Sequence, residues 1–466
     1  MSALWTSDEI AQAAGGTASV HFEVNGVAFD SREIGPGDLF IAMKGEATDG
    51  HLFLDRAFGA GAAGAIVSED VVHPHVRVED TTKALNDLGR ASRARSLARI
   101  CGVTGSVGKT GTKEALYAAL DRSLPGQAHR SVKSYNNHTG VPLSLARMPR
   151  GTRFGVFEMG MNHAGELAAL TRLVRPHVAI VTAIAPAHRE FFASEEEIAE
   201  AKGEIFQGLE PGGVAIVPYD SPHRDQLIAA ARPHAETILT FGLGEGADVR
   251  ARDVAHLESG GTMLTAVLPE AELTFTLAQP GEHWVSNALA VLAAVETMGG
   301  DLAAAGLAMA DMPGLKGRGE RHRIRFDGGE ALLIDESYNA NPASMRATLK
   351  SLAQQKVEGR RIAVLGSMRE LGVGSDDFHA ALADPVAACV DYAILVGEEM
   401  KALAKALGPK VNMTHVADAA SAVQPLRDAI RPGDAILVKG SNSIGLAAVV
   451  EAFASRLSAG LGTGKD

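Results

Sequence analysis

The sequence contains very little cysteine and no long apolar run. Cys101 and Cys389 are the only cysteines among 466 residues, which excludes a disulfide framework and favours a reducing compartment. The longest apolar run, residues 178–185, is far too short to span a bilayer. The N-terminus carries Asp8 and Glu9 instead of the apolar stretch of a signal peptide. We therefore expect a soluble, cytoplasmic protein without membrane insertion.

An excess of positive charge is also missing. Lysine and arginine number 44 and aspartate and glutamate 56, so the net charge is −12. Such a chain offers no broad surface to nucleic acid or to an anionic membrane, and any polyanion has to be held in a local pocket. Hydrophobic residues make up 46% and charged residues 21%, which is typical of a folded globular protein. At roughly 150 residues per domain, the length indicates about three domains.

The pattern of expected elements divides the chain at residues 1–98, 99–319 and 320–466. The first segment mixes short strands with helices. The second alternates strands and helices, which predicts a parallel sheet with helices on both faces. Its residues 248–277 instead indicate antiparallel strands, as in an added sheet. The expected strands are 27–31, 39–43, 65–68, 100–104, 154–158, 178–183 and 214–217, and the helices of the second segment are 109–120, 166–174, 194–209 and 284–298.

A stretch rich in proline and glycine, residues 312–319, predicts a linker into the third segment. Beyond it the alternation resumes, which indicates a doubly wound, Rossmann-like domain, but no GxGxxG follows its first strand and we expect no dinucleotide site there. The fold class predicted for the whole chain is α/β. The elements expected in the third segment are strands at 332–335, 362–365, 393–396 and 435–438 and helices at 343–354, 376–389 and 417–430.

The clearest functional signal is a glycine-rich turn between the strand at 100–104 and the helix that follows. Its glycines let backbone N–H groups point inward, and the helix N-terminus adds partial positive charge, so the turn suits a phosphate. Lys109 would reach the β- and γ-phosphates and the Thr110 hydroxyl would bind Mg²⁺. Val103 stands where the strict pattern GxxxxGK[ST] has glycine, so a chance turn is the alternative; strand, loop and helix in the required order favour nucleotide binding. The turn reads Thr104-Gly105-Ser106-Val107-Gly108-Lys109-Thr110.

Two residues are candidate metal ligands near this loop. Glu158 ends an apolar strand, and an acid at the end of a strand beside a phosphate loop is placed to hold Mg²⁺. Otherwise it merely terminates the strand. His188 follows the next strand and is a candidate ligand for a second ion; the alternative is an ordinary polar surface residue.

Lys202 is predicted to face inward. Helical spacing places it between Ile198 and Ile205 on the apolar face of its helix. A bare buried ammonium is expensive, so this lysine needs a partner or a modification. It could snorkel to solvent, pair with Glu158 or Glu204, or take up CO₂ as a carbamate, because burial lowers a lysine pKa and exposes the neutral amine.

Several further motifs occur in one order along essentially the whole chain. They are Asp30-Ser31-Arg32, the phosphate loop, Asn136-Asn137-His138-Thr139-Gly140, Glu158-Met159-Gly160, Ala187-His188, Ala201-Lys202-Gly203-Glu204, Ser337-Tyr338-Asn339-Ala340-Asn341-Pro342 and Leu437-Val438-Lys439-Gly440. This set resembles the Mur ligases of peptidoglycan synthesis.

The resemblance implies an ATP-dependent ligase that joins D-alanyl-D-alanine to a UDP-N-acetylmuramoyl tripeptide through an acyl phosphate. We expect the enzyme to be a monomer. It implies an N-terminal domain for the UDP end of the substrate, a central ATP-binding domain and a C-terminal domain for the incoming amine. Two Mg²⁺ ions are implied as well. Thr110 and Glu158 would hold one of them, and His188 with a carbamylated Lys202 would hold the second.

The resemblance also implies roles for other residues. Lys109, His188, Lys202 and Arg318 would be the catalytic group, with Arg318 on the γ-phosphate. Asn287 would contact adenine and Asp335 the ribose. The residues expected along the path of the UDP-muramoyl peptide are Ser31, Arg32, Lys44, Asn137 and Thr139. Two other readings stay open: another acid–amine ligase of the same superfamily, and a P-loop switch protein, although the Asn-Lys-x-Asp motif of guanine-selective switches is missing from the sequence.

Overall fold

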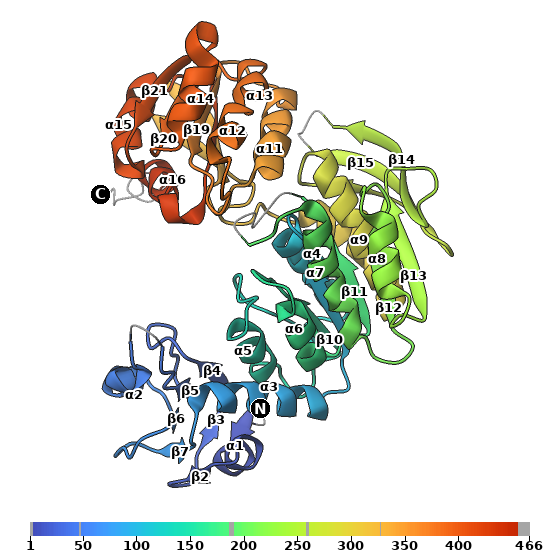
Figure 1. The fold of residues 1–466 in the computed structure, drawn as a ribbon, viewed down its shortest axis with the longest axis vertical. Helices are drawn as coiled ribbons and strands as arrows, with labels where there is room; N and C mark the ends of the chain where they lie inside the picture. The colour runs from blue at the N-terminus through green and yellow to red at the C-terminus, as the bar shows by residue number, and fades with distance from the viewer. Residues whose placement is uncertain (1–2, 46–47, 186–190, 258–260, 327, 455–466) are drawn as a thin grey trace, which may run out of the picture.

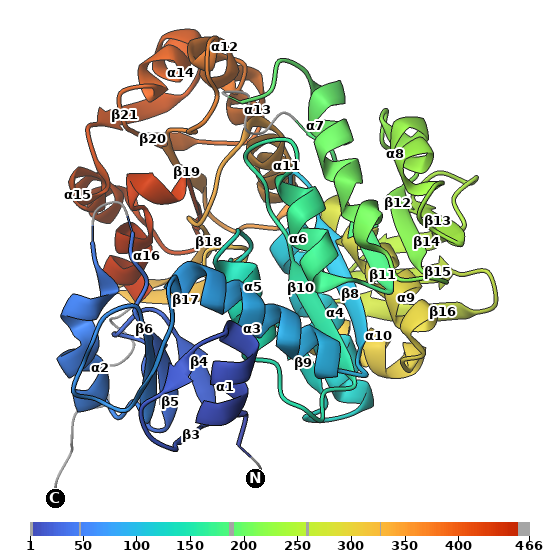
Figure 2. The same cartoon turned by 60° about the horizontal axis from the view of Figure 1, so that its bottom comes forward.

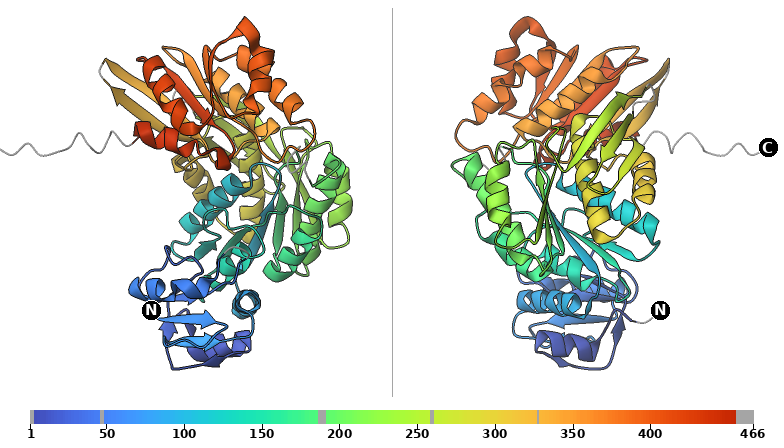
Figure 3. Two further views of the ribbon diagram at one scale, coloured as in Figure 1. Left: turned by 60° about the vertical axis from the view of Figure 1, so that its left-hand side comes forward. Right: turned by 90° about the vertical axis from the view of Figure 1, so that its right-hand side faces the viewer.

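The computed structural model describes residues 3–45, 48–185, 191–257, 261–326 and 328–454. Three α/β parts follow one another in a row, with the N-terminal part at one end and the C-terminal part at the other (Figure 1 and Figure 3). The predicted fold class is confirmed. In the described part of the chain, no helix is both long and apolar enough to cross a lipid bilayer.

The N-terminal part is a small sheet with helices beside it. Its strands run in the order β2-β7-β6-β5-β4, with only the β2–β7 pair antiparallel among the pairs described. A short antiparallel pair, β1 with β3, lies apart from this sheet. The elements are β1 (Trp5–Thr6), α1 (Ser7–Ala14), β2 (Thr17–Ala18), β3 (Glu23–Val24), β4 (Gly26–Ala28), β5 (Asp38–Ile41), η1 (Gly50–Phe53), α2 (Leu54–Gly59), β6 (Gly64–Val67), β7 (His75–Arg77) and α3 (Thr81–Arg95).

The central sheet runs in the order β16-β15-β14-β13-β12-β11-β8-β10-β9 and is parallel from β14 to β9. Successive side chains of its strand β8 point to opposite faces, so Ile100 joins one apolar core and Cys101 the other. The sheet is therefore covered on both faces, as predicted. Its strands are β8 (Arg99–Thr104), β9 (Ala128–Arg130), β10 (Phe154–Glu158), β11 (Val178–Val181), β12 (Val214–Pro218), β13 (Thr237–Gly242), β14 (Val249–His256), β15 (Thr262–Val267) and β16 (Glu272–Leu277).

Two details of the central segment differ from the sequence prediction. Residues 248–277 do form antiparallel strands, but not a separate sheet: β14 pairs in parallel with β13 and so continues the same sheet, which satisfies the backbone groups of an otherwise open edge. The α-helix predicted over 194–209 ends at Gly203 and continues as a 3₁₀ turn. There the Glu204 carboxylate accepts from the Gly165 and Ala168 N–H groups, at the start of α6. The helices are α4 (Lys109–Ser123), α5 (Gly140–Ala146), α6 (Glu166–Val174), α7 (Glu195–Gly203), η2 (Glu204–Gly208), α8 (Arg224–Ala231), α9 (Glu282–Met298) and α10 (Leu302–Asp311).

The C-terminal sheet runs in the order β17-β18-β22-β19-β20-β21, and only the β17–β18 pair is antiparallel among the described pairs. Apolar cores on both faces confirm the doubly wound arrangement. The predicted helix 376–389 is broken in two after Ala380, because Pro385 has no N–H to offer the carbonyl of Ala381. The elements are β17 (Glu320–Phe326), β18 (Gly329–Glu336), α11 (Pro342–Gln354), β19 (Arg361–Gly366), α12 (Ser375–Ala380), α13 (Ala383–Ala387), β20 (Tyr392–Val396), α14 (Met400–Leu407), η3 (Gly408–Lys410), β21 (Asn412–Val416), α15 (Ala419–Ala429), β22 (Ala435–Lys439), η4 (Asn442–Ile444) and α16 (Ala447–Ala454).

Helix α3 joins the N-terminal part to the central part. It packs against α5 (Figure 2), where Gly89 allows an approach so close that a Cβ would lie 3.1 Å from the Cα of Pro142. The buried Arg93 donates to the carbonyls of Val174, at 2.8 Å, and Arg175, at 2.7 Å. These contacts stabilise the orientation of one part on the other.

Candidate active site

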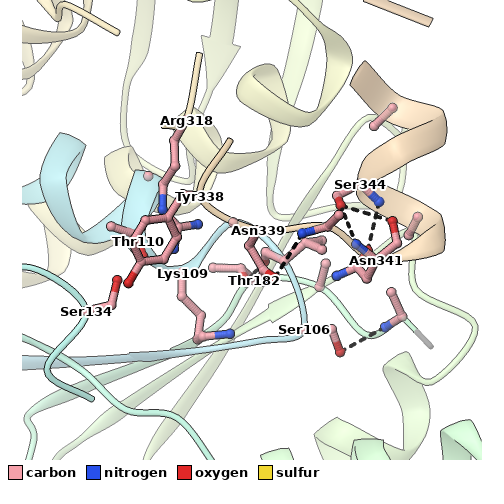
Figure 4. A pocket seen from close by; sticks show the side chains of 18 of the residues that line it. Ser106, Lys109, Thr110, Ser134, Thr182, Arg318, Tyr338, Asn339, Asn341 and Ser344 are labelled. Carbon is pink, nitrogen blue, oxygen red and sulfur yellow. Dashed lines mark hydrogen bonds between the residues drawn. The ribbon is translucent and has the colours of Figure 1, made fainter. Parts of the chain in front are cut away.

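A cavity of about 840 Å³ lies between the central and C-terminal parts. It is lined by the phosphate loop, the segments after β10 and β11, the start of α9, the linker and the segments after β18, β19 and β22. The carboxyl ends of parallel strands therefore open into it from two sheets, which is where α/β proteins bind ligands. Figure 4 shows side chains from both parts pointing into this space.

The phosphate loop has the backbone of an anion-binding turn. Gly105 and Gly108 have φ of +148° and +86°, in a region that favours glycine. The Ser106 N–H donates to the Ala183 carbonyl at 2.7 Å, and the Thr182 hydroxyl donates to the Val107 carbonyl at 2.6 Å. Thr182 and Ala183, which follow β11, thus hold the phosphate loop in place by hydrogen bonds.

Lys109 begins helix α4 and reaches back over the loop. Its Nζ donates to the Gly105 carbonyl at 2.5 Å. Burial lowers the pKa of Lys109; the Glu158 carboxylate opposes this shift, and the Arg318 charge adds to it. Lysine, carboxylate and guanidinium thus line one cavity although they come from three distant stretches of the chain.

Gly105 provides a direct test of the loop. A Cβ at this position would lie 2.0 Å from the Thr182 hydroxyl oxygen. We expect Gly105→Ala to weaken ADP binding at least about tenfold, since the loop has to shift away from its supporting threonine. Calorimetric titration with ADP measures this.

Gly126→Ala is the matched control. Gly126 also has a positive φ, of +74°, but a Cβ there would meet no atom within 4 Å. The control should lose about 1 kcal/mol of stability and keep its ADP affinity. Equal affinities for the two variants would contradict the role given to the loop backbone.

Glu158 is buried beside the phosphate loop because β10 pairs with β8 and places Glu158 opposite Val103. Thr110 Oγ1 donates to its Oε2 at 2.9 Å, and Asn136 Nδ2 donates to its Oε1 at 2.8 Å. The Glu158 N–H donates to Ser131 Oγ at 3.0 Å. A hydroxyl and a carboxylate so placed are the hard oxygen ligands that Mg²⁺ prefers, so these residues fit a magnesium ion.

Lys202 is buried at 1% exposure and lines the cavity, as its helical position predicts. Burial holds its pKa well below the usual value, and the charge of Lys109 acts in the same direction. The salt bridges considered from the sequence do not form: within the described ranges Glu158 accepts from Thr110 and Asn136, and Glu204 from backbone N–H groups of α6. His188, the other candidate ligand of a second metal, lies outside the described residues.

The linker contributes Arg318, whose guanidinium stacks over the Tyr338 ring at 4.3 Å from the ring centroid. Figure 4 shows both residues on the side of the cavity that faces Lys109 and Thr110. Asp335 is not among the residues that line the cavity; it is buried under the linker, where its carboxylate accepts from the N–H groups of Gly317, at 2.9 Å, and Ser337, at 3.0 Å. Asp335 therefore sets the path of the linker.

Asn287, on helix α9, packs directly on the phosphate loop. Its Oδ1 would lie 2.8 Å from a Cβ placed on Gly108, and it lines the cavity. One turn earlier, the Trp284 ring covers Gly111 of α4. The start of α9 thus forms a wall of the nucleotide end of the cavity.

The residues expected to meet the UDP-muramoyl peptide lie outside this cavity. Arg32 pairs with Asp30 at 2.6 Å, and Lys44 pairs with Glu69 at 2.7 Å in the N-terminal part. Ser31 is buried in the same part. Asn137 and Thr139 share a hydrogen bond of 3.0 Å between their side chains in the segment before α5.

Several residues in or near the cavity were not among the site residues predicted from the sequence. Thr182 follows β11 and Lys439 ends β22, where its Nζ donates to the Asn339 carbonyl at 3.0 Å. A search for polar residues at the carboxyl ends of the predicted strands would have found both. Asn136 stands in one of the motifs that carry the resemblance, but its contact to Glu158, like that of the buried Lys113, depends on tertiary packing and has no local signal.

A phosphate loop that opens into a cavity between two α/β parts is typical of an enzyme that uses a nucleotide. Three family domains match in order along the chain: "Mur ligase family, catalytic domain" over residues 23–99, "Mur ligase middle domain" over 103–295 and "Mur ligase, glutamate ligase domain" over 317–442. The chain belongs to the Mur ligase family and is an ATP-dependent ligase that forms a peptide bond.

Similar proteins span nearly the same length. UDP-N-acetylmuramoyl-tripeptide--D-alanyl-D-alanine ligase of Escherichia coli K12 is 35% identical, over 92% of this chain and 94% of its own. A crystal structure of MurF from Acinetobacter baumannii has a TM-score of 0.82 at 30% identity, covering 97% of this chain and 99% of that one. MurF of Thermotoga maritima in complex with ADP has a TM-score of 0.77 at 27% identity, covering 94% of this chain and 98% of that one.

Proposed function

We propose that this enzyme joins D-alanyl-D-alanine to a UDP-N-acetylmuramoyl tripeptide, with ATP converted to ADP and phosphate. The observation that carries the proposal is the meeting of Lys109, Glu158, Lys202 and Arg318 around one cavity between two domains. The names of the full-length relatives supply the substrates.

The reaction needs an activated acid, because a carboxylate and an amine at neutral pH form a salt rather than an amide. A carboxylate oxygen of the tripeptide attacks the γ-phosphorus, the bond from that phosphorus to the bridging oxygen breaks, and ADP leaves. The amine nitrogen of D-alanyl-D-alanine then attacks the acyl carbon. Phosphate leaves with the electron pair of the C–O bond, and the amine loses a proton.

The protein's own charges support phosphoryl transfer. Lys109 and Arg318 would neutralise charge on the transferring group, and the N–H groups of the phosphate loop would hold the phosphates. Asn287 would contact adenine at the wall formed by α9. Asp335, which lies under the part of the linker that lines the cavity, would contact the ribose. Closure about the linker would exclude water from the acyl phosphate, which hydrolyses readily.

Thr110 and Glu158 would hold one Mg²⁺, and His188 with a carbamylated Lys202 would hold a second. Bound Mg²⁺ supplies neutralisation of the phosphate oxygens. For the carbamate, the neutral Lys202 amine attacks CO₂, a nitrogen–carbon bond forms and one proton leaves. The low pKa that burial imposes on Lys202 supports this step.

The UDP-muramoyl peptide would enter from the N-terminal part. Ser31, Arg32 and Lys44 would meet its UDP end, and Asn137 and Thr139 would lie along its path to the cavity. The segment that carries Asn137 and Thr139 begins at Ser131, beside Glu158, and its Tyr135 donates to Glu33 of the N-terminal part. It therefore joins the N-terminal part to the reacting groups.

The decisive measurement is ADP formation by the purified enzyme with UDP-N-acetylmuramoyl tripeptide, with and without D-alanyl-D-alanine. We expect sustained turnover only when both are present, because the acyl phosphate forms on one substrate and is consumed by the other. A panel of other acids and amines serves as the control. Turnover with a different pair would indicate another acid–amine ligase, and ATP hydrolysis insensitive to both would indicate a switch protein.

A further inference from the structure

Lys113 is a buried lysine that the proposed reaction does not use. It lies on α4 one turn after Lys109, and its side chain is 0% exposed. Its Nζ donates to the backbone carbonyl of Lys133 at 2.7 Å. The same Nζ lies 3.0 Å from Glu114 Oε1 and 3.7 Å from Glu158 Oε2. A buried ammonium is tolerated only with such partners, so this one is fixed in place.

The carbonyl that Lys113 holds belongs to a strained residue. Lys133 has φ of +53°, in the left-handed region that residues other than glycine rarely adopt. Such a conformation persists where the surrounding structure imposes it. The hydrogen bond from the Lys113 ammonium to the Lys133 carbonyl is a contact able to impose it.

The segment around Lys133, residues 131–136, contacts both the N-terminal part and Glu158 beside the phosphate loop. Toward the N-terminal part, the Lys133 ammonium forms an ion pair with Glu33, and Tyr135 Oη donates to Glu33 Oε1 at 2.7 Å. Glu33 follows Ser31 and Arg32 directly in the chain. Toward the phosphate loop, Asn136 and Ser131 both hydrogen bond to Glu158.

We propose that Lys113 is a positioning residue that holds residues 131–136 in the conformation that joins Glu33 to Glu158, and thereby couples the N-terminal part to the nucleotide site. A coupling of this kind is reciprocal: occupancy of either site changes the affinity of the other by the same factor. The positioning claim stands on the contacts above. The coupling claim rests in addition on the proposed function, since it requires the UDP-muramoyl peptide to bind near Glu33.

Hydrogen exchange of the full-length protein tests the positioning claim without any ligand. We expect Lys113→Met to speed exchange of the amides of residues 131–136 at least about tenfold, because the left-handed residue loses its support. Adding Lys133→Gly should slow exchange again, since glycine adopts this φ without strain. Adding Lys133→Ala to Lys113→Met should leave the exchange fast, because alanine is strained at this φ. Both changes at Lys133 remove its ion pair, so their difference reports the backbone alone.

Unchanged exchange in Lys113→Met, or equal recovery by glycine and alanine, would overturn the proposal. Should Lys113→Met not fold, the single variants at the exposed Lys133 decide: exchange in residues 131–136 should be slower with glycine than with alanine, and equal rates count against the proposal. An effect of Lys113→Met confined to the Mg²⁺ dependence of ADP binding would show that Lys113 acts on the Glu158 charge instead, which also overturns it.

Calorimetry tests the coupling. The affinity for UDP-N-acetylmuramoyl tripeptide is measured with and without Mg²⁺ and a non-hydrolysable ATP analogue. We expect a difference of about fivefold or more in the native enzyme and a ratio near one in Lys113→Met, with part of the difference regained in Lys113→Met/Lys133→Gly. A native ratio of one overturns the coupling. Failure of the native enzyme to bind this peptide refutes the proposed function and the coupling with it, and leaves the exchange result to decide the positioning claim.

Discussion

Lys109→Ala is expected to lower the rate of ADP formation by at least about a thousandfold at saturating substrates. The Lys109 ammonium lies at the start of α4, over the phosphate loop and opposite Arg318, and alanine leaves nothing in its place. Because alanine is a good helix former, α4 should stay intact. Steady-state kinetics with both substrates measures the loss, and thermal unfolding checks the fold.

Lys83→Ala is the matched control for this variant. Lys83 is an exposed lysine on α3 whose ammonium pairs with Asp87, four residues on, at 2.6 Å. An exposed pair of this kind contributes little to stability, so activity and unfolding should stay close to those of the native enzyme. Turnover by Lys109→Ala within tenfold of the control would mean that the γ-phosphate binds elsewhere.

Lys202→Ala is expected to lower turnover at least about a hundredfold and to regain part of it with formate or acetate. The loss follows if the modified lysine holds a metal that neutralises phosphate charge, a contribution of several kcal/mol. The recovery follows because alanine leaves space beside the cavity for a small carboxylate to take the place of the carbamate. The measurement is the rate of ADP formation as a function of added carboxylic acid.

Lys202→Met separates this account from a simple loss of packing. Methionine fills the space of the lysine stem, so added carboxylates should restore nothing. A direct readout is the carbon-13 resonance of a carbamate after equilibration of the native enzyme with labelled bicarbonate, with both variants as blanks. Absence of this signal together with absence of rescue in Lys202→Ala would show that the lysine acts as an amine or ammonium.

Much of the fold was predictable because the signals are local. The strand Phe154–Glu158 and the helix Glu166–Val174 have the predicted bounds, since an apolar run and a 3.6-residue period depend on neighbouring residues alone. The antiparallel strands within residues 248–277 were also predicted, but their position at the edge of the central sheet was not. Whether a new strand starts its own sheet or extends an old one depends on which edge is open after the chain has folded.

The candidate site likewise has features that local sequence predicts and features that depend on the tertiary structure. The phosphate loop and the inward direction of Lys202 follow from spacing along one helix or turn. The hydrogen bond from Thr110 to Glu158 does not, because it depends on β8 and β10 being neighbours in the sheet. Asn136 was assigned no contact to Glu158 for the same reason, and Lys113 has the sequence context of a solvent-exposed helical lysine.

The amino-acid order alone determined that this chain is an α/β protein with a phosphate loop, because hydrophobic period and glycine placement act over a few residues. Tertiary structure alone decided which distant polar groups face that loop and that Asp335 accepts a hydrogen bond from the linker. It also decided that Lys113 of α4 is buried and donates to the carbonyl of Lys133, which has a left-handed backbone. These outcomes depend on the pairing of strands and the packing of domains, and burial then sets the pKa values and partners of the charged groups.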